Sequence, residues 1–163
     1  MAEPHHRRVS LNRPDLKFDP DDPPGFRCGM WRFGESLGAE RVGTTLYELP
    51  PGEAVCAYHY ELPAEEWLLV LDGNPTVREP DGEYRLEPMD VAFFAPGPRG
   101  AHQVRNDSTE TVRVLMWGEN LYPAAAIYPD SNKIGIWTRA GEGARLYRLG
   151  TELGYYDGET DPP

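Results

Sequence analysis

Hydrophobic and polar residues follow one another in short stretches from residue 42 onward, and prolines and glycines separate the stretches. The first stretch, VGTTLYEL, is rich in β-branched and aromatic residues and ends at PPG, a strong turn signal. A second turn signal, PDG at 80–82, lies between two further stretches and predicts a hairpin. None of these stretches has helical periodicity, so the pattern favours an all-β sandwich or barrel. Strands are predicted at 42–49, 55–61, 66–71, 76–79, 83–86, 91–94, 102–106, 111–117 and 133–138.

The chain divides into three parts. Residues 1–40 are predicted to form an N-terminal arm, in which DPDDPPG cannot hold a helix or a central strand because proline fixes φ and lacks a donor. Residues 26–39 of this arm, where glycines interrupt aromatics, are expected to pack on the barrel. Residues 41–119 are expected to form the barrel itself. Residues 120–163 are expected to form a C-terminal extension that packs on the barrel.

Composition narrows the class of partner. The 163 residues suit one domain, and they include 17 Gly and 17 Pro, too many turn-forming residues for a helical bundle. Asp and Glu number 27 against 16 Lys and Arg, which gives a formal net charge of -11. Such a surface repels phosphate backbones and anionic lipid headgroups, so neither a nucleic-acid nor a membrane partner is expected. A cation is the partner that this charge favours.

Cysteine content and apolar runs indicate the compartment. Cys28 and Cys56 are the only cysteines and fit no zinc-ribbon spacing, so we expect two free thiols, with Cys56 on the strand face opposite His59. The N-terminus lacks the apolar core of a secretory signal. The longest apolar run, Trp67 to Leu71, is too short to span a bilayer. These features predict a cytoplasmic protein.

Four ionisable side chains are expected to meet inside the barrel. Because side chains alternate between the two faces of a strand, His59 and Glu61 share one face, and Glu66 and His102 each share a face with apolar neighbours. Buried charges are costly unless they are paired or bound to a metal. A divalent ion would neutralise both carboxylates and use the lone pairs of neutral imidazoles. The alternative is a metal-free barrel in which both histidines are simply hydrogen-bonded.

Two segments resemble the two sequence motifs of the cupin superfamily. The first is GEAVCAYHYELPAEEWLLVLDG and the second is MDVAFFAPGPRGAHQVRN. The residues that fall on motif positions are His59, Glu66, Gly73, Pro98, Gly100, His102 and Asn106. The resemblance is best over residues 42–118, and LYELPPG and YPDSNKIG also look like segments of small single-domain bacterial cupins. It implies the cupin double-stranded β-helix, a jelly-roll barrel.

The resemblance also implies a set of metal ligands. The family's ligand positions carry over to His59, Glu66 and His102, while Glu61 stands where the family has a second histidine. Glu61 is therefore either a fourth ligand or a general base. Two histidines with two carboxylates leave a divalent ion near neutrality, which weakens it as a Lewis acid. These donors suit iron, manganese, zinc or nickel. A second departure, Met89 in place of a motif glycine, alters only a turn.

Three classes of function fit these features. The leading hypothesis is a metal-dependent enzyme of isomerase or oxygenase type that acts on a small polar molecule. The second is a non-catalytic binding module that senses a small molecule or a metal. The third is a metal-free, epimerase-like enzyme that uses His59 or His102 with Glu66 as an acid–base pair. Cupins host many activities, so the family resemblance does not choose among them.

An outward-facing apolar stripe is expected on one strand. It consists of Trp67, Leu69 and Leu71. Either the N-terminal arm or a second copy of the chain can cover it. Because large exposed apolar patches usually mark contacts, we expect a homodimer.

Overall fold

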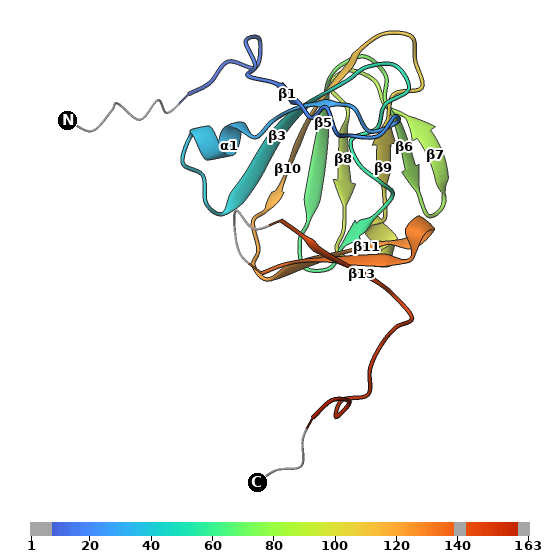
Figure 1. The fold of residues 1–163 in the computed structure, drawn as a ribbon. Coiled ribbons are helices and arrows are strands. Elements are labelled where there is room, and N and C mark those ends of the chain that lie inside the picture. Colours follow the sequence, from blue (N-terminus) through green and yellow to red (C-terminus); the bar gives the residue numbers. More distant parts are fainter. Residues whose placement is uncertain (1–7, 139–142, 160–163) are drawn as a thin grey trace, which may run out of the picture.

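The protein is built almost entirely from antiparallel strands, and the computed structural model describes residues 8–138 and 143–159. The largest sheet has six strands in the order β1-β2-β3-β10-β5-β8 (Figure 1). Its strands are β1 (Lys17–Phe18), β2 (Gly29–Trp31), β3 (Val42–Leu49), β10 (Val112–Glu119), β5 (Glu66–Asp72) and β8 (Val91–Phe94).

Two smaller sheets complete the fold. One has the order β7-β6-β9, and the other, β13-β12-β11-β4, lies across one end of the barrel in Figure 1. Their strands are β4 (Tyr60–Glu61), β6 (Thr76–Glu79), β7 (Gly82–Arg85), β9 (Gln103–Arg105), β11 (Ala124–Tyr128), β12 (Lys133–Trp137) and β13 (Arg145–Arg148). The short helical turns are α1 (Phe33–Ser36), η1 (Pro98–Gly100) and η2 (Pro129–Ser131).

The core lies inside the barrel and is filled by alternate residues of its strands. Leu68 and Val70 of β5 are fully buried, and so are Val112 and Val114 of β10. Trp67, which points the other way, stacks on the outer face of the sheet. The predicted alternation along β5 is confirmed, and it fixes Glu66 on the inner side of the barrel.

The strand predicted at 55–61 is wrong over most of its length. Only Tyr60–Glu61 forms a strand, and His59 makes an isolated bridge. The amides of Val55 and His59 donate to Val104 and His102, so four residue steps on one side face two on the other. The extra residues form a bulge, and strict alternation of side chains fails there. By contrast, the strands predicted at 42–49, 76–79 and 91–94 have the predicted bounds.

The C-terminal extension joins the barrel through a strand that the sequence pattern missed. β11 pairs with β12 on one side and with β4 on the other. Its sequence, AAAIY, is alanine-rich and lies between prolines, so it has little intrinsic strand preference. Pairing in the sheet overrides that preference and brings the extension against the residues around Glu61. The residue boundaries of the three parts remain predictions.

The N-terminal arm is more ordered than a linker. β1 and β2 extend the six-stranded sheet beyond β3, and α1 follows directly. The Arg113 guanidinium also donates to the carbonyl of Leu11, which ties the arm to β10. The expected packing of residues 26–39 on the barrel is confirmed. Within the described residues, no helix has the length and apolar character needed to cross a bilayer.

Candidate metal centre

His59 and His102 lie opposite each other across the isolated antiparallel bridge. The His59 amide donates to the His102 carbonyl at 3.1 Å, and the His102 amide donates back at 2.8 Å. Residues directly opposite in an antiparallel pair project their side chains to the same face. The two imidazole rings accordingly have centroids 4.8 Å apart, and both histidines are buried.

Backbone carbonyls fix the orientation of both imidazoles. Nδ1 of His59 lies 3.0 Å from the carbonyl oxygen of Ala57, and Nδ1 of His102 lies 2.9 Å from that of Gly100. A carbonyl only accepts, so each Nδ1 carries the proton and each Nε2 keeps its lone pair. Burial lowers the pKa of His59, and burial together with His59 lowers the pKa of His102 to about 3. Both rings are therefore neutral, as metal ligands must be.

A close contact between backbone segments fixes the position of the Gly100 carbonyl. A Cβ at Gly100 would lie 1.8 Å from the carbonyl oxygen of Ala95, so no other residue fits there. The motif glycine thus holds the turn that precedes His102. Phe94 then stacks on the His102 ring with centroids 3.6 Å apart.

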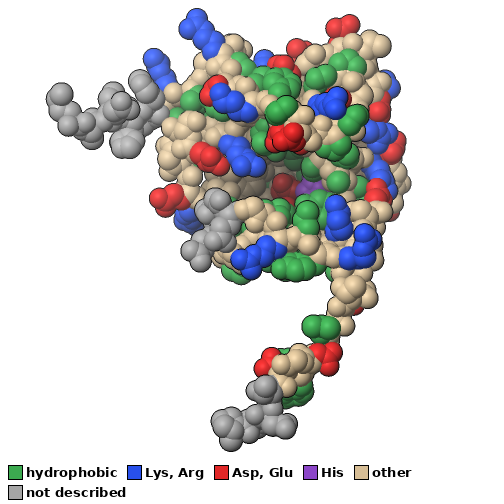
Figure 2. All heavy atoms as spheres, viewed as in Figure 1, with side chains coloured by type: hydrophobic (Ala, Val, Ile, Leu, Met, Phe, Trp, Pro, Cys, Tyr) green, Lys and Arg blue, Asp and Glu red, His purple; other side chains and the backbone are tan. Residues whose placement is uncertain are grey.

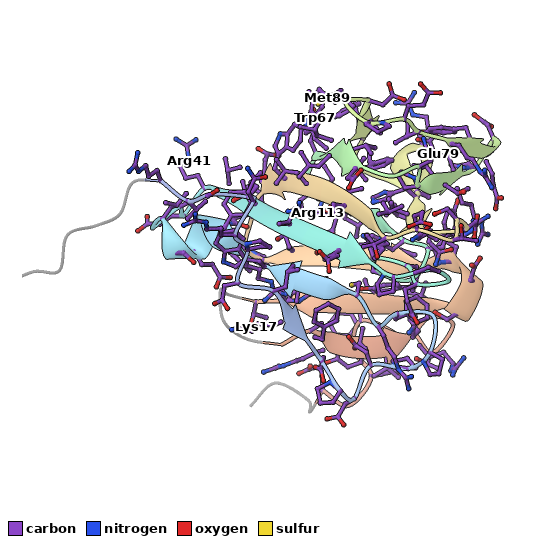
Figure 3. All side chains as sticks on the ribbon, turned by 90° about the horizontal axis from the view of Figure 1, so that it is seen from above. Lys17, Arg41, Trp67, Glu79, Met89 and Arg113 are labelled. Carbon is purple, nitrogen blue, oxygen red and sulfur yellow. The ribbon has the colours of Figure 1, made fainter. Side chains whose placement is uncertain are left out.

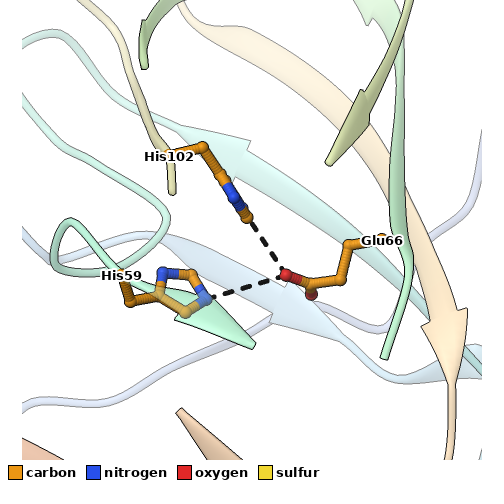
Figure 4. Close-up of side chains that lie close together, drawn as sticks. All are labelled: His59, Glu66 and His102. Atoms are coloured by element: carbon orange, nitrogen blue, oxygen red, sulfur yellow. Dashed lines mark ion pairs between the residues drawn. The ribbon is translucent and has the colours of Figure 1, made fainter. Parts of the chain in front are cut away.

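Glu66 completes a compact group of three ligands (Figure 4). Its Oε2 atom lies 3.6 Å from Nε2 of His102 and 3.7 Å from Nε2 of His59. The three candidate ligand atoms lie within 4.8 Å of one another. Burial raises the pKa of the Glu66 carboxyl to about 7, because nothing in the protein offsets its desolvation.

The group meets a physical test for a metal site. Oε2 of Glu66 and Nε2 of His102 are buried and lack hydrogen-bond partners in the described structure. Buried polar atoms are rarely left unpaired, and an ion is one of the standard explanations. Two imidazole nitrogens and a carboxylate also match the donors that first-row divalent metals prefer. His59, Glu66 and His102 therefore fit a divalent ion.

Glu61 is the fourth predicted residue and lies beside this group. Its Oε1 atom is 3.9 Å from Nε2 of His59, but it falls outside the three-residue ligand set. Burial and the neighbouring Glu66 carboxylate raise the pKa of Glu61 to about 7. The structure thus brings all four predicted side chains together. Their roles as ligands or as a base remain predictions.

A cavity of about 400 Å³ is lined by His59, Glu61 and Glu66. Figure 2 shows histidine and acidic side chains at the bottom of a hollow beside the C-terminal strands. Tyr128 of β11 lines the cavity, and its ring stacks on that of His59 at 5.8 Å. Tyr47 of β3 and Trp137 of β12 line it as well. The motifs gave no signal for these aromatics, because residues distant in sequence meet only through the sheet pairing.

The orientation expected for Cys56 is wrong. It lines the cavity, and its Sγ atom is 3.4 Å from Nδ1 of His59, because the bulge between residues 55 and 59 breaks the alternation. Burial raises the pKa of the thiol well above its usual range, so the sulfur stays protonated. Cys56 and Cys28 are both free, as predicted.

Comparison with known proteins identifies the fold family. The cupin domain family matches residues 45–118, and this stretch contains His59, Glu61, Glu66 and His102. Residues 45–118 form a cupin domain. Cupin domains commonly hold divalent metals, in keeping with the candidate site. No curated protein sequence matches the chain.

Solved structures share the fold of this cupin over most of its length. A sugar phosphate isomerase of the cupin superfamily from Silicibacter pomeroyi is 22% identical, with a TM-score of 0.77 over 91% of this chain and 97% of that one. A candidate sugar phosphate isomerase from Acidithiobacillus ferrooxidans is 24% identical, with a TM-score of 0.76 over 90% and 95%. The polyketide cyclase RemF from Streptomyces resistomycificus is 22% identical, with a TM-score of 0.56 over 69% and 78%. These likenesses establish the jelly-roll barrel.

Proposed function

We propose that this cupin is a divalent-metal-dependent enzyme that isomerises a small polar molecule. The observation that carries the proposal is the group of His59, Glu66 and His102, whose candidate ligand atoms lie within 4.8 Å of one another beside a cavity that His59 and Glu66 line. A volume of about 400 Å³ suits a small metabolite and lies within the usual range of ligand pockets. A bound ion would polarise an oxygen atom of the substrate there.

The isomerase class is favoured by Glu61. Its carboxylate is near His59 but is not needed for the three-ligand set, so it is free to move a proton. In a hydroxy-carbonyl compound, one base takes the proton from the hydroxyl-bearing carbon and returns it to the neighbouring carbonyl carbon. The hydroxyl proton passes to the carbonyl oxygen. This reaction is balanced without any oxidant, whereas an oxygenase would require dioxygen as co-substrate. One structural neighbour is named as a sugar phosphate isomerase and another as a candidate one, in keeping with this reaction class.

Elemental analysis of protein purified without an affinity tag tests the metal. We expect iron, manganese, zinc or nickel near one ion per chain. Affinity should fall at least about 100-fold in His59→Ala, because even indirect changes around a metal cost up to that factor. Glu66→Gln should also lose metal, and Glu65→Gln, an exposed neighbour on the outer side, is the matched control. Absence of metal from every preparation would favour the metal-free epimerase instead.

Glu61→Gln separates the two roles of that residue. If Glu61 is the base, the variant keeps its metal and loses about 100-fold or more in turnover, as general bases usually contribute. Loss of metal in the same variant would make Glu61 a fourth ligand. Full turnover with full metal content would contradict both roles. A protein that binds metal and small molecules but turns over none of a panel of hydroxy-carbonyl compounds would be a binding module.

We also propose that the protein is a homodimer. Trp67, Phe93 and Trp117 form a stack of aromatic rings on the outer face of the six-stranded sheet, and Val91 beside them is 54% exposed. β8 is the edge strand of that sheet, so the patch reaches a free edge. A second copy of the chain can cover both.

A further inference from the structure

Arg32 is a cation in the wall of the cavity beside the candidate metal centre. It follows β2, precedes α1 and lines the cavity that reaches His59 and Glu66. Within the described parts of the chain, its guanidinium has no hydrogen bond or ion pair. Arg78 binds Asp130, and Arg105 binds Glu83. Arg32 differs from the other described arginines in that it lines this cavity.

A second cavity adjoins the first at Arg32. It has a volume of about 600 Å³ and reaches α1 through Glu35. The residues that line both cavities are Arg32, Gly43, Thr45, Asn120, Tyr122 and Trp137. Arg32 therefore stands in the wall between the candidate metal centre and the second cavity.

The charged residues that line the two cavities are mostly acidic. Glu61, Glu66 and Glu119 line the first cavity, and Glu35 lines the second. Of the described side chains that line the two cavities, Arg32 is the only cation. Burial raises the pKa of the Tyr47 hydroxyl above its usual range, and the Arg32 guanidinium opposes that rise.

We propose that Arg32 binds an anionic group of the substrate, a phosphate or a carboxylate, while the reacting end lies at His59, Glu66 and His102. This inference rests on the proposed function and specifies its substrate. A guanidinium presents two parallel N–H donors that match the oxygens of either anion. Without such a cation, the acidic surface and the acidic lining would repel an anionic substrate. The side chains of Thr45 and Asn120 supply neutral donors beside it.

Equilibrium dialysis of the full chain against inorganic phosphate and against acetate tests the inference. Each anion is measured with metal-loaded and chelator-treated protein, because an anion can also bind the ion itself. The variants are Arg32→Gln, Arg32→Lys and, as a matched control, Arg8→Gln, an exposed arginine outside both cavities. Arg32 is itself exposed, so its replacement should leave thermal unfolding unchanged.

We expect Arg32→Gln to weaken binding of one anion about tenfold, the usual worth of a charge-assisted hydrogen-bonded pair. Arg32→Lys should keep the charge but lose the paired geometry, for a loss of about threefold. Preference for phosphate would indicate a phosphate ester as substrate, and preference for acetate a carboxylic acid. Equal binding by wild-type protein and Arg32→Gln would overturn the inference. Metal content is measured on the same samples, so absence of metal with intact Arg32-dependent binding would refute the proposed enzyme and leave the anion site.

Discussion

Met89 occupies a backbone conformation that favours glycine. Its φ is 75°, and it lies in the turn where the Asp90 amide donates to the Glu87 carbonyl at 3.0 Å. With Pro88 before it, Met89 stands at the third position of the turn, where a type II turn needs positive φ and prefers glycine. The side chain is 72% exposed and therefore gains little from burial. Methionine at this motif position strains the backbone and contributes little to packing.

Met89→Gly should stabilise the protein. Relief of the left-handed conformation is worth about 1 kcal/mol, partly offset by the greater freedom of glycine in the unfolded chain, which leaves about 0.5 kcal/mol. Chemical denaturation measured by tryptophan fluorescence gives the free energy of unfolding. Met89→Ala is the control, because it removes the same side chain but keeps the Cβ and its strain. Equal stability of the two variants would contradict this account.

Asn106 joins two segments at one end of the barrel. It is fully buried, and its Nδ2 donates to the carbonyls of Leu49 at 2.9 Å and Glu110 at 2.7 Å. Its Oδ1 accepts from the amide and the hydroxyl of Ser108. One side chain thus fixes the end of β3 and the turn between β9 and β10. The sequence motif marked Asn106, and the structure shows that its role is to hold this turn.

Asn106→Ala should lower the free energy of unfolding by about 3 kcal/mol, because it leaves several buried polar groups unpaired. Asn74→Ala is the matched control, since Asn74 donates a single side-chain bond, to the carbonyl of Leu86 at 3.1 Å. We expect the control to cost about 1 kcal/mol, the typical worth of one hydrogen bond. Thermal and denaturant unfolding measure both variants. Similar losses in the two would mean that the Asn106 network contributes no more than one bond.

The bulge between residues 55 and 59 shows what an element-scale pattern cannot predict. The sequence AYHYE reads as a regular strand, yet four steps of this segment face two steps of its neighbour. Only the pairing with residues 102–104 reveals the extra residues. The bulge places Cys56 in the wall of the cavity. Regular strand pairing begins again at β4, and the Glu61 carboxylate of that strand lies near His59.

At the scale of the whole molecule, one face of the barrel remains apolar and open. Figure 3 shows Trp67 and Met89 on the same side of the molecule. Phe93, which contacts Trp67 at a centroid distance of 4.6 Å, is 43% exposed. The N-terminal arm, which the sequence offered as an alternative cover, contacts Arg113 at the other end of the outer face of β10 from Trp117. The proposed homodimer is therefore expected to use this face.

Phe93→Asp should convert the dimer to a monomer, because it buries a charge in an apolar interface. Light scattering after size exclusion should give twice the chain mass of 18.4 kDa for the wild type and the single mass for the variant. Leu146→Asp, at an exposed apolar residue on β13, is the control and should stay dimeric. Dissociation by the control alone would place the interface on the C-terminal sheet. A monomeric wild type would refute the dimer.

The sequence by itself determined the β-rich barrel, the bounds of β3, β6 and β8 and the four residues at its centre. It could do so because side-chain alternation, turn residues and motif spacing are local properties of the chain. Only the tertiary structure decided which nitrogen and oxygen atoms of the site are free to bind a ligand. The Ala57 and Gly100 carbonyls fix the imidazole protons, burial isolates Oε2 of Glu66, and β11 brings Tyr128 onto His59. These features depend on groups that are distant in sequence or on the course of the backbone, so no local pattern can encode them.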